Sequence, residues 1–464
     1  MKREIAVFLG EDPVRIGTLS YAQDGNRESC AFAYDDAWLA STDAFELSPS
    51  LPLRAGWRHH SKGKGGSVFF DCIADTEPNG WGKKVILRDG ARQRQDGNAD
   101  RQPLNSLDFL LSVDDFSRLG ALRFRDEQGE FVRISTPSGS PPMIELKHLV
   151  ASSRAVEMGK ETERDLAFLR GRGTSLEGMR PKASIVDDSG NLYLAKFPSA
   201  EDTRNVVAGE IMALQLASDA KIRVPDFRLV DSGGVPVALI RRFDREAGKR
   251  VMYVSAATLL QADSEGEHTY TEIVDTLRQR SAFAKDDMAE LWRRMAFNIL
   301  IKNVDDHLHN HGFLHYGHGR WALAPAFDLN PFPDKAHVLK TWISEETGES
   351  GSIRDAYETA RHFGLDKTQA AAILGEVVKA ASGWQRVAAS LGMKRNEIQE
   401  FEPAFEHAQM KEAIRIVEGA LLCAPKASAK TDAPATAEFL QESSGLRSDK
   451  QLALLASTKP PEHK

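Results

Sequence analysis

The densest group of residues that could do chemistry is the segment NVDDHLHNHGFLH, residues 303–315. Asp305 is followed five residues later by Asn310, and Asp328 stands at the end of a short apolar run further on. Phosphoryl transfer needs a carboxylate that orients the attacking hydroxyl, together with an amide and a carboxylate that hold Mg²⁺. The types and spacing of these three residues therefore fit a catalytic loop for phosphoryl transfer.

Two lysines and a glutamate upstream supply the other parts that this chemistry requires. Lys182 and Lys196 each lie in an expected strand, and Glu210 lies on the apolar helix that follows. In a kinase, a strand lysine holds the nucleotide phosphates and is itself held by a helix glutamate. The order along the chain, from strand lysine through helix glutamate to catalytic loop and later aspartate, is the order that a kinase would need.

Each of these residues also has an interpretation without catalysis. Asp305 and Asp306 could be solvated loop acids, and Asn310 could close a turn. Both lysines could be edge-strand charges, and Glu210 could be a surface residue of its helix. Taken one at a time, these interpretations are the better ones, and it is the shared order that favours a kinase.

The histidines of the same segment offer a rival site. The alternate spacing of His307, His309 and His311 would place three imidazoles on one face of a strand, where Asp305 could complete a metal site. Catalytic metal sites usually draw their ligands from several elements, however, and the neighbouring residues already fit another scheme. We therefore expect His307 to brace the loop, as the histidine of a kinase catalytic loop does.

The glycine-bearing segment GRGTSLEGMRPKAS, residues 171–184, only hints at a phosphate cradle. It matches neither the P-loop pattern nor the dinucleotide-binding pattern. Contact between its backbone N–H groups and a phosphate is a hypothesis. No G-x-S-x-G motif is present, which disfavours an α/β-hydrolase.

The first half of the chain must position these residues largely with strands. Short apolar runs at 5–10, 14–21 and 31–39, separated by turn signals, predict a β-rich front. The charged stretch from Leu87 to Gln102 is interpreted as an exposed loop, and 143–158 as a helix. Further on, the segments KASIV with LYLAKF, and DFRLV with VPVALIRRF, predict two hairpins with a helix over 206–217 between them.

Helices dominate the pattern from about residue 254. The clearest covers 286–303, where Asp287 and Glu290 resemble a capping box at the start. Similar periodicity predicts helices over 366–380 and 404–422. The tail after Cys423, rich in alanine, proline, serine and lysine, is expected to be disordered or weakly helical.

Composition excludes several classes of protein. The 464 residues carry 60 Lys and Arg against 67 Asp and Glu, a net charge of −7, which argues against autonomous nucleic-acid binding. Three scattered cysteines fit a reducing compartment and give no zinc framework. No run is apolar enough for a signal peptide or a membrane span, so we expect a soluble cytoplasmic protein with no membrane partner.

The ordered set of motifs resembles the HipA-type serine/threonine kinases, the toxin halves of bacterial toxin–antitoxin modules, over most of residues 1–420. The motifs are VRIGTLSY, SPSLPLR, FFDCIADTEPNGWGKK and DFLLSVDDFSRLGALRF in the front, GMRPKASI, LAKFPS, AGEIMALQLA, KIRVPDF and IRRFDR in the middle, and NVDDHLHNHGFL and PAFDLNP in the rear.

The resemblance implies an α+β, two-lobed protein-kinase-like fold with a β-rich N-terminal part and a mainly helical C-terminal lobe. It divides the chain into a β-rich HipA-type N-terminal domain (1–140), a nucleotide-binding middle region (141–253) and a helical C-terminal kinase lobe (254–423). Residues 424–464 would be a disordered tail, which the resemblance does not explain.

Matched motif by motif, the resemblance also implies roles for single residues. Asp305 is similar to the family's catalytic base, and Asn310 and Asp328 to its magnesium ligands. Lys196 would hold the ATP phosphates with Glu210 as its partner. The remaining nucleotide contacts would come from Glu177, Gly178, Met179, Arg180, Pro181 and Lys182 in a covering loop, from Arg241, Arg242 and Phe243 in the hinge, and from His307, Asn310, Phe327 and Asp328.

Three further positions bear on regulation and on departures from the family. Ser175 falls where the family has an autophosphorylated serine, whose modification ejects the loop and silences the kinase; a phosphate there would add about −1.5 to −2 charge. Arg241 stands where a glutamate is common in the hinge, and His309 where a lysine is common.

The function implied is an ATP- and Mg²⁺-dependent serine/threonine protein kinase that is neutralised by a HipB-like helix-turn-helix antitoxin. Operator DNA would be reached indirectly through the antitoxin, and the protein substrate would be a translation factor such as an aminoacyl-tRNA synthetase. Two alternatives stay open: a small-molecule kinase on the same scaffold, and a catalytically silent co-repressor. The complete set of Asp305, Asn310, Asp328 and Lys196 disfavours the co-repressor.

Overall fold

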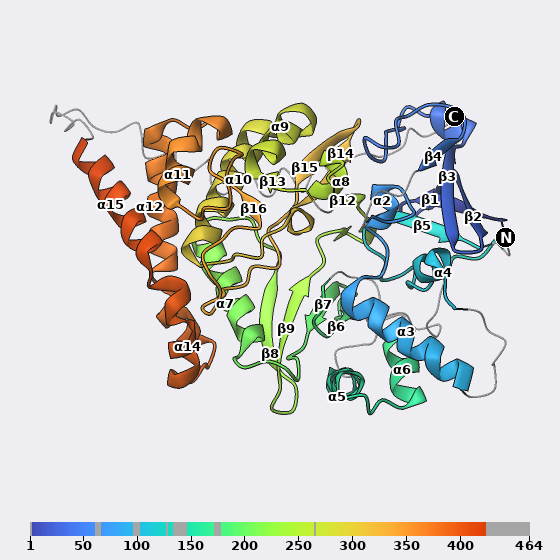
Figure 1. The fold of residues 1–464 in the computed structure, drawn as a ribbon, viewed down its shortest axis with the longest axis horizontal. Coiled ribbons are helices and arrows are strands. Elements are labelled where there is room, and N and C mark those ends of the chain that lie inside the picture. Colours follow the sequence, from blue (N-terminus) through green and yellow to red (C-terminus); the bar gives the residue numbers. More distant parts are fainter. Residues whose placement is uncertain are drawn as a thin grey trace. The chain divides into compact units, whose positions relative to one another are not determined.

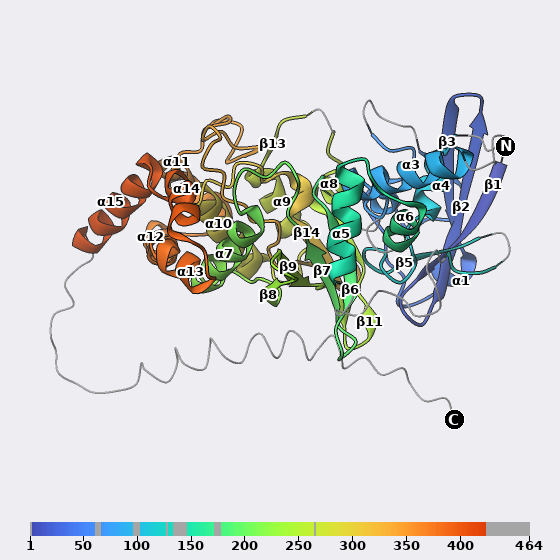
Figure 2. The same ribbon diagram turned by 90° about the horizontal axis from the view of Figure 1, so that it is seen from below.

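The computed structural model describes residues 2–60, 66–95, 103–126, 129–132, 146–170, 178–263 and 266–423 (Figures 1 and 2). Ser175, Glu177 and the predicted tail after Cys423 lie outside these ranges.

An antiparallel sheet with strand order β4-β3-β2-β1-β5 forms the front of the chain, as predicted (blue and cyan in Figure 1). Ile5 of β1 lies opposite Leu19 of β2, and both are fully buried. Successive strand side chains point to opposite faces, so the alternating apolar residues build a core under one face. The elements are β1 (Lys2–Leu9), β2 (Val14–Asp24), β3 (Arg27–Tyr34), α1 (Asp36–Leu39), β4 (Arg58–His60), α2 (Asp71–Ala74), α3 (Gly80–Gln95), α4 (Ser106–Leu111) and β5 (Leu122–Arg125).

Helix α3 overturns the exposed loop that we expected from Leu87 to Gln102. The helix runs to Gln95, and its inward side buries Trp81, Val85 and Ile86. Lysine, arginine, glutamine and leucine are good helix formers, and one buried side is enough to hold such a helix in place. The charged stretch was misread because the apolar anchors precede it; residues 96–102 lie outside the described ranges.

A second sheet, with order β6-β7-β9-β8, contains both predicted hairpins and carries the strand lysines. Alternate residues of β9 face different cores: Ala238 and Ile240 pack with α7, whereas Val237 and Leu239 pack with α3, α5 and α6. Both faces of this sheet are therefore covered. The elements are α5 (Leu146–Glu157), α6 (Glu163–Leu169), β6 (Lys182–Val186), β7 (Leu192–Lys196), α7 (Val206–Asp219), β8 (Phe227–Asp231), β9 (Pro236–Arg241), β10 (Arg245–Glu246) and β11 (Lys249–Arg250).

The rear is mainly helical, as predicted, with a small sheet of order β12-β14-β15 beside the catalytic loop. The loop runs from the end of α10 to the start of β14 and includes a 3₁₀ turn, η2. None of the helices in the described ranges has the length and apolarity that a membrane crossing requires. The elements are β12 (Tyr253–Ser255), α8 (Ala256–Leu260), β13 (His268–Thr269), α9 (Tyr270–Arg280), α10 (Ala284–Leu300), η2 (Leu308–Asn310), β14 (Gly312–Gly317), β15 (Arg320–Leu323), β16 (Thr341–Trp342), α11 (Ile353–Glu358), η3 (Thr359–Phe363), α12 (Lys367–Ala381), α13 (Trp384–Ser390), α14 (Arg395–Phe405) and α15 (Ala408–Cys423).

The predicted capping box of α10 is wrong. The helix starts at Ala284, and Asp287 is fully buried within its first turn. The Asp287 carboxylate accepts hydrogen bonds from Ser281 Oγ at 2.7 Å and from the backbone N of Leu323 at 3.0 Å. Arg223 pairs with the same carboxylate at 2.6 Å. Tertiary partners hold this carboxylate, which ties α10 to β15.

Candidate active site

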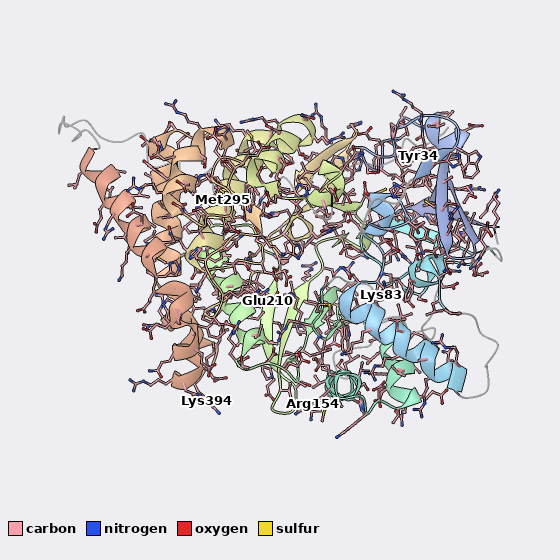
Figure 3. The ribbon with its side chains drawn as sticks, viewed as in Figure 1. Tyr34, Lys83, Arg154, Glu210, Met295 and Lys394 are labelled. Carbon is pink, nitrogen blue, oxygen red and sulfur yellow. The ribbon has the colours of Figure 1, made fainter. Side chains whose placement is uncertain are left out.

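Strand β7 ends in a lysine held by two carboxylates. Lys196 Nζ lies 2.5 Å from Glu210 Oε1 on α7 and 2.5 Å from Asp328 Oδ1. Glu210 is labelled in Figure 3, on the side of α7 near the second sheet. The Asp328 backbone has φ of 57°, the left-handed region that few non-glycine residues adopt. Such strained positions cluster at functional sites.

The charges in this cluster shift one another's pKa values. Burial alone would lower the pKa of Lys196, but the carboxylates of Asp328 and Glu210 outweigh it and raise that pKa. Burial would raise the pKa of Asp328, yet Lys196 and Lys182 hold it well below its usual range. Burial raises the pKa of Glu210, although Lys196 opposes the shift. Lys196 therefore stays protonated and Asp328 ionised near neutral pH.

Buried Asp306 fixes the loop that was predicted to be catalytic. Its carboxylate accepts hydrogen bonds from the Tyr270 hydroxyl, from Asn298 Nδ2 at 2.9 Å and from His311 Nε2 at 2.9 Å. Its backbone carbonyl accepts one from Thr341 Oγ1 at 2.7 Å. Burial would raise the pKa of Asp306, but His311 lowers it. Asp306 is therefore a structural anchor and not a solvated loop acid.

The loop histidines do not share one face of a strand. His307 and His309 flank or belong to the turn η2, and β14 begins only at Gly312. His311 is the imidazole that braces the loop, through Asp306, whereas His307 lines a cavity. In the described part of the chain, no group of three His, Cys, Asp or Glu side chains is placed to hold a metal ion.

Asp305 leaves this buried network and faces solvent. Its side chain is 49% exposed, and Oδ2 lies 3.8 Å from Lys335 Nζ. Its backbone carbonyl accepts a hydrogen bond from Asn310 Nδ2 at 3.2 Å. Asp305 lines an open cavity of about 400 Å³ together with Lys335 and Lys340. The carboxylate is thus accessible to a molecule that approaches from outside.

Most of the predicted nucleotide-binding residues line one other cavity, of about 350 Å³. Two groups of side chains stand out in its lining: Lys182, Lys196 and Asp328, which we call the charged end, and the rings of Phe243, Tyr253 and Phe327, which we call the apolar end. The predicted residues that line it are Gly178, Met179, Lys182, Lys196, Arg241, Arg242, Phe243, His307, Asn310, Phe327 and Asp328.

Four predicted residues stand apart from this lining. Glu210 acts behind Lys196, and Asp305 lies in the neighbouring cavity. Arg180 pairs with Asp202, and the Pro181 carbonyl accepts a hydrogen bond from the backbone N of Phe197 at 2.9 Å. Arg180 and Pro181 thus join the segment before β6 to the segment that follows β7, while Ser175 and Glu177 lie outside the described residues.

The sequence motifs match known families over two segments. A model described as the HipA N-terminal domain matches residues 5–124, and one described as the HipA-like C-terminal domain matches residues 174–384. The chain belongs to the HipA family.

Two curated relatives are named "Putative kinase": one from Haemophilus influenzae, 25% identical over 35% of this chain and 55% of its own length, and Y4mE from Sinorhizobium fredii, 24% identical over 71% and 79%. The chain thus spans little more than half of the Haemophilus relative.

The fold matches a chain of the Shewanella oneidensis MR-1 toxin–antitoxin complex of HipA, HipB and operator DNA. The TM-score is 0.62 at 15% identity, over 90% of this chain and 97% of that one. The predicted α+β class, with a β-rich N-terminal part and a mainly helical C-terminal part, is confirmed.

One wall of the cavity was missed by sequence reasoning. Asp75, Asn79, Gly80 and Leu119, all in the part matched by the HipA N-terminal model, line it. Asp75 accepts hydrogen bonds from Ser255 N at 2.7 Å and Ser255 Oγ at 2.8 Å. The first three lie in the motif FFDCIADTEPNGWGKK, whose polar residues carry no recognisable chemical pattern, so their place was not foreseeable.

Proposed function

We propose that this chain is an ATP- and Mg²⁺-dependent kinase that phosphorylates serine or threonine residues of a protein. The observation that carries the proposal is the lining of the 350 Å³ cavity, which combines Lys196 and Asp328 with aromatic rings, while Glu210 holds Lys196 from outside the lining. A nucleoside triphosphate suits such a lining, because the flat faces of its base can pack on aromatic rings and its phosphates are anionic.

The residues at the charged end fit the triphosphate and its metal ion. Lys182 lies opposite Lys196 across β6 and β7, so two ammonium groups face the phosphate end. Asn310 and Asp328 offer amide and carboxylate oxygens, the donors that Mg²⁺ prefers. When bound, the ion would neutralise charge on the transferred phosphoryl group.

In this proposal Asp305 receives the proton of the acceptor hydroxyl. It lies on the same loop as Asn310 but opens into the separate 400 Å³ cavity, so nucleotide and acceptor would approach the loop from different sides. Asp305 and Lys335 are each nearly half exposed. An open acceptor side favours a protein segment over a small molecule, which enclosed pockets usually bind.

Membership of the HipA family supports a role as the toxin of a toxin–antitoxin pair. The partners in this proposal are a HipB-like helix-turn-helix antitoxin and, through it, operator DNA; the matched Shewanella structure contains HipA, HipB and operator DNA. The protein substrate would be a translation factor such as an aminoacyl-tRNA synthetase. Autophosphorylation of Ser175 stays a prediction, tested by mass spectrometry after incubation with Mg-ATP.

The test is incubation of the full chain with γ-labelled Mg-ATP and a host lysate, alongside the Asp305→Asn variant. Label on a host protein, lost in the variant, is the expected result. Label found only on small molecules would favour the small-molecule kinase. Nucleotide binding without any transfer would favour a co-repressor.

A further inference from the structure

At the apolar end of the nucleotide cavity, one lining residue comes from the N-terminal part of the chain. Leu119 lines this end with Phe243, Tyr253 and Phe327. The Phe243 ring centroid lies 6.2 Å from that of Tyr253 and 5.5 Å from that of Phe327. An aliphatic side chain set among aromatic rings is a typical lining for the flat, apolar part of a ligand.

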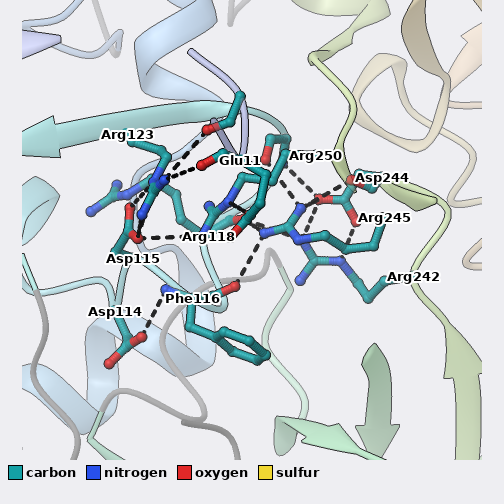
Figure 4. Close-up of polar contacts among 12 residues, drawn as sticks. Glu11, Asp114, Asp115, Phe116, Arg118, Arg123, Arg242, Asp244, Arg245 and Arg250 are labelled. Atoms are coloured by element: carbon teal, nitrogen blue, oxygen red, sulfur yellow. Dashed lines mark hydrogen bonds and ion pairs between the residues drawn. The ribbon is translucent and has the colours of Figure 1, made fainter. Parts of the chain in front are cut away.

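Both neighbours of Leu119 form hydrogen bonds with residues that directly follow the hinge. The Arg118 carbonyl accepts a hydrogen bond from Arg245 Nη2 at 2.8 Å, and the backbone N of Gly120 donates to Asp244 Oδ2 at 2.7 Å. Figure 4 shows Arg118 and Asp244 within one cluster of polar contacts. The residue between two fixed backbone groups has little freedom to move.

A buried ion cluster holds the hinge side of this attachment. Asp244 pairs with Arg242 at 2.5 Å and with Arg245 at 2.7 Å. Arg242 Nη1 also donates to the Ser117 carbonyl at 3.1 Å, one residue before Arg118. We call Asp244, Arg242, Arg245 and the backbone they hold at 117–120 the hinge latch.

Gly120 confirms how closely this segment approaches the cavity wall. Its φ is +72°, and a Cβ at this position would lie 3.1 Å from the backbone N of Tyr253. The chain can therefore come near β12 here because glycine lacks a side chain. Gly120 therefore packs directly against Tyr253, which belongs to the cavity wall.

We propose that Leu119 is a base-contacting residue, supplied to the nucleotide site by the N-terminal part of the chain and positioned by the hinge latch. The inference rests on the proposed function, since it names a contact of the same site. It separates two contributions to affinity: Leu119 acts on the base, whereas the lysine cluster acts on the phosphates.

Calorimetry on the full chain tests this separation with three probes: Mg-ATP, adenosine and magnesium tripolyphosphate. Leu119→Ala should weaken binding of Mg-ATP and adenosine by roughly three- to thirtyfold, because a buried leucine contact is lost. Binding of tripolyphosphate should not change. Leu119→Met should restore the affinity for ATP, because methionine fills a similar volume.

Leu39→Ala is the matched control, because Leu39 is a partly buried leucine of the same region that packs against the core away from the cavity lining. It should bind all three probes as the wild type does. Equal losses for ATP and tripolyphosphate in Leu119→Ala, or no loss at all, would overturn the inference while leaving the kinase proposal standing. A wild-type chain that binds neither ATP nor tripolyphosphate would overturn both.

Discussion

At the residue scale, two adjacent aspartates lie in opposite environments. Asp305 is half exposed and forms an ion pair with Lys335 at 3.8 Å, whereas Asp306 is buried among Tyr270, Asn298 and His311. Sequence alone could not separate them, since both are loop acids next to each other. The difference arises from tertiary partners on α9 and α10, which the sequence does not reveal.

Asp305→Asn should reduce phosphoryl transfer by about 10²- to 10⁴-fold, the usual contribution of a general base. Fold and nucleotide binding should be retained, because the side chain is exposed and lies outside the nucleotide cavity. Labelled phosphate transfer and calorimetry measure the two effects. Undiminished turnover would refute the assigned role.

Asp306→Asn should behave differently and lower stability by about 1–3 kcal/mol, because an amide cannot accept from all the donors that surround the carboxylate. Thermal unfolding of both variants gives the comparison. If Asp306→Asn unfolded at the same temperature as Asp305→Asn, the anchor would be a misreading of these contacts.

At the scale of elements, α3 and the covering loop meet through two glycines. The backbone N of Trp81 donates to the Gly178 carbonyl at 3.0 Å, and a Cβ on Gly80 would lie 2.5 Å from that carbonyl oxygen. Helix α3 therefore begins against the loop that we propose to cover the nucleotide. The sequence analysis placed a loop over the later part of this helix, and it did not foresee the contact at the start of the helix.

Gly80→Ala should lower the affinity for Mg-ATP, because the added Cβ must displace the Gly178 carbonyl. Gly25→Ala is the control: Gly25 also has positive φ, +57°, but a Cβ there meets nothing within 4 Å. Both variants should lose about 1 kcal/mol of stability from the backbone alone. Equal ATP affinity in the two variants would show that the Gly80 contact is irrelevant to binding.

We expect His315 of β14 to make the free energy of unfolding depend on pH. The His315 ring stacks on Phe45 with centroids 3.6 Å apart, and burial lowers the pKa of His315 from 6.5 to about 4. Between these two values the unfolded chain binds more protons than the folded one, so stability falls as the pH drops from about 6.5 to about 4.

His315→Phe should flatten part of this fall in unfolding temperature. His337, whose pKa burial also lowers to about 4, would account for a further part in the same window. The same substitution at exposed His362 provides the control. An unchanged slope in His315→Phe would contradict the assignment.

The elements themselves were largely predictable, whereas contacts between distant segments were not. Apolar runs on either side of a turn signal identified the hairpin that carries Lys182 and Lys196, and a longer apolar run identified α7 with Glu210. Spacing alone could not show that Lys196, Glu210 and Asp328 meet, since they are brought together by folding; the resemblance to a family supplied that expectation. The role of Asp287 was misjudged because its partners, Ser281, Leu323 and Arg223, lie outside its own helix turn.

At the scale of the whole molecule, the hinge latch joins the N-terminal sheet region to the second sheet. Asp244 is 1% exposed and contacts Arg242, Arg245 and the backbone of Gly120. Burial would raise the pKa of Asp244, but the two guanidinium groups outweigh it and hold that pKa far below its usual range. The four-part division at 140, 253 and 423 stays a prediction.

Asp244→Asn should destabilise the chain by about 3–5 kcal/mol, because two buried guanidinium groups lose their counter-charge. A carboxylate with a depressed folded pKa stabilises above its unfolded pKa of about 3.9 and loses that contribution as the pH falls further. The variant should therefore show a shallower acid-unfolding curve below about pH 4.

Urea and acid titrations of Asp244→Asn, beside those of Asp275→Asn, provide the measurement. Asp275 forms an exposed pair with Arg278, so its substitution should change stability by less than about 1 kcal/mol. If the two variants unfolded alike, the buried cluster would contribute no more than a surface pair.

The cavity wall formed by Asn79, Gly80 and Leu119 also matters for identifying active family members in genome sequences. A gene that encoded only the C-terminal module would keep Lys196, Asp305, Asn310 and Asp328 yet lack one side of the pocket. Motif searches would count its product as a complete enzyme. A census of active members should therefore require both modules in the same open reading frame, or a separate gene that restores the missing one.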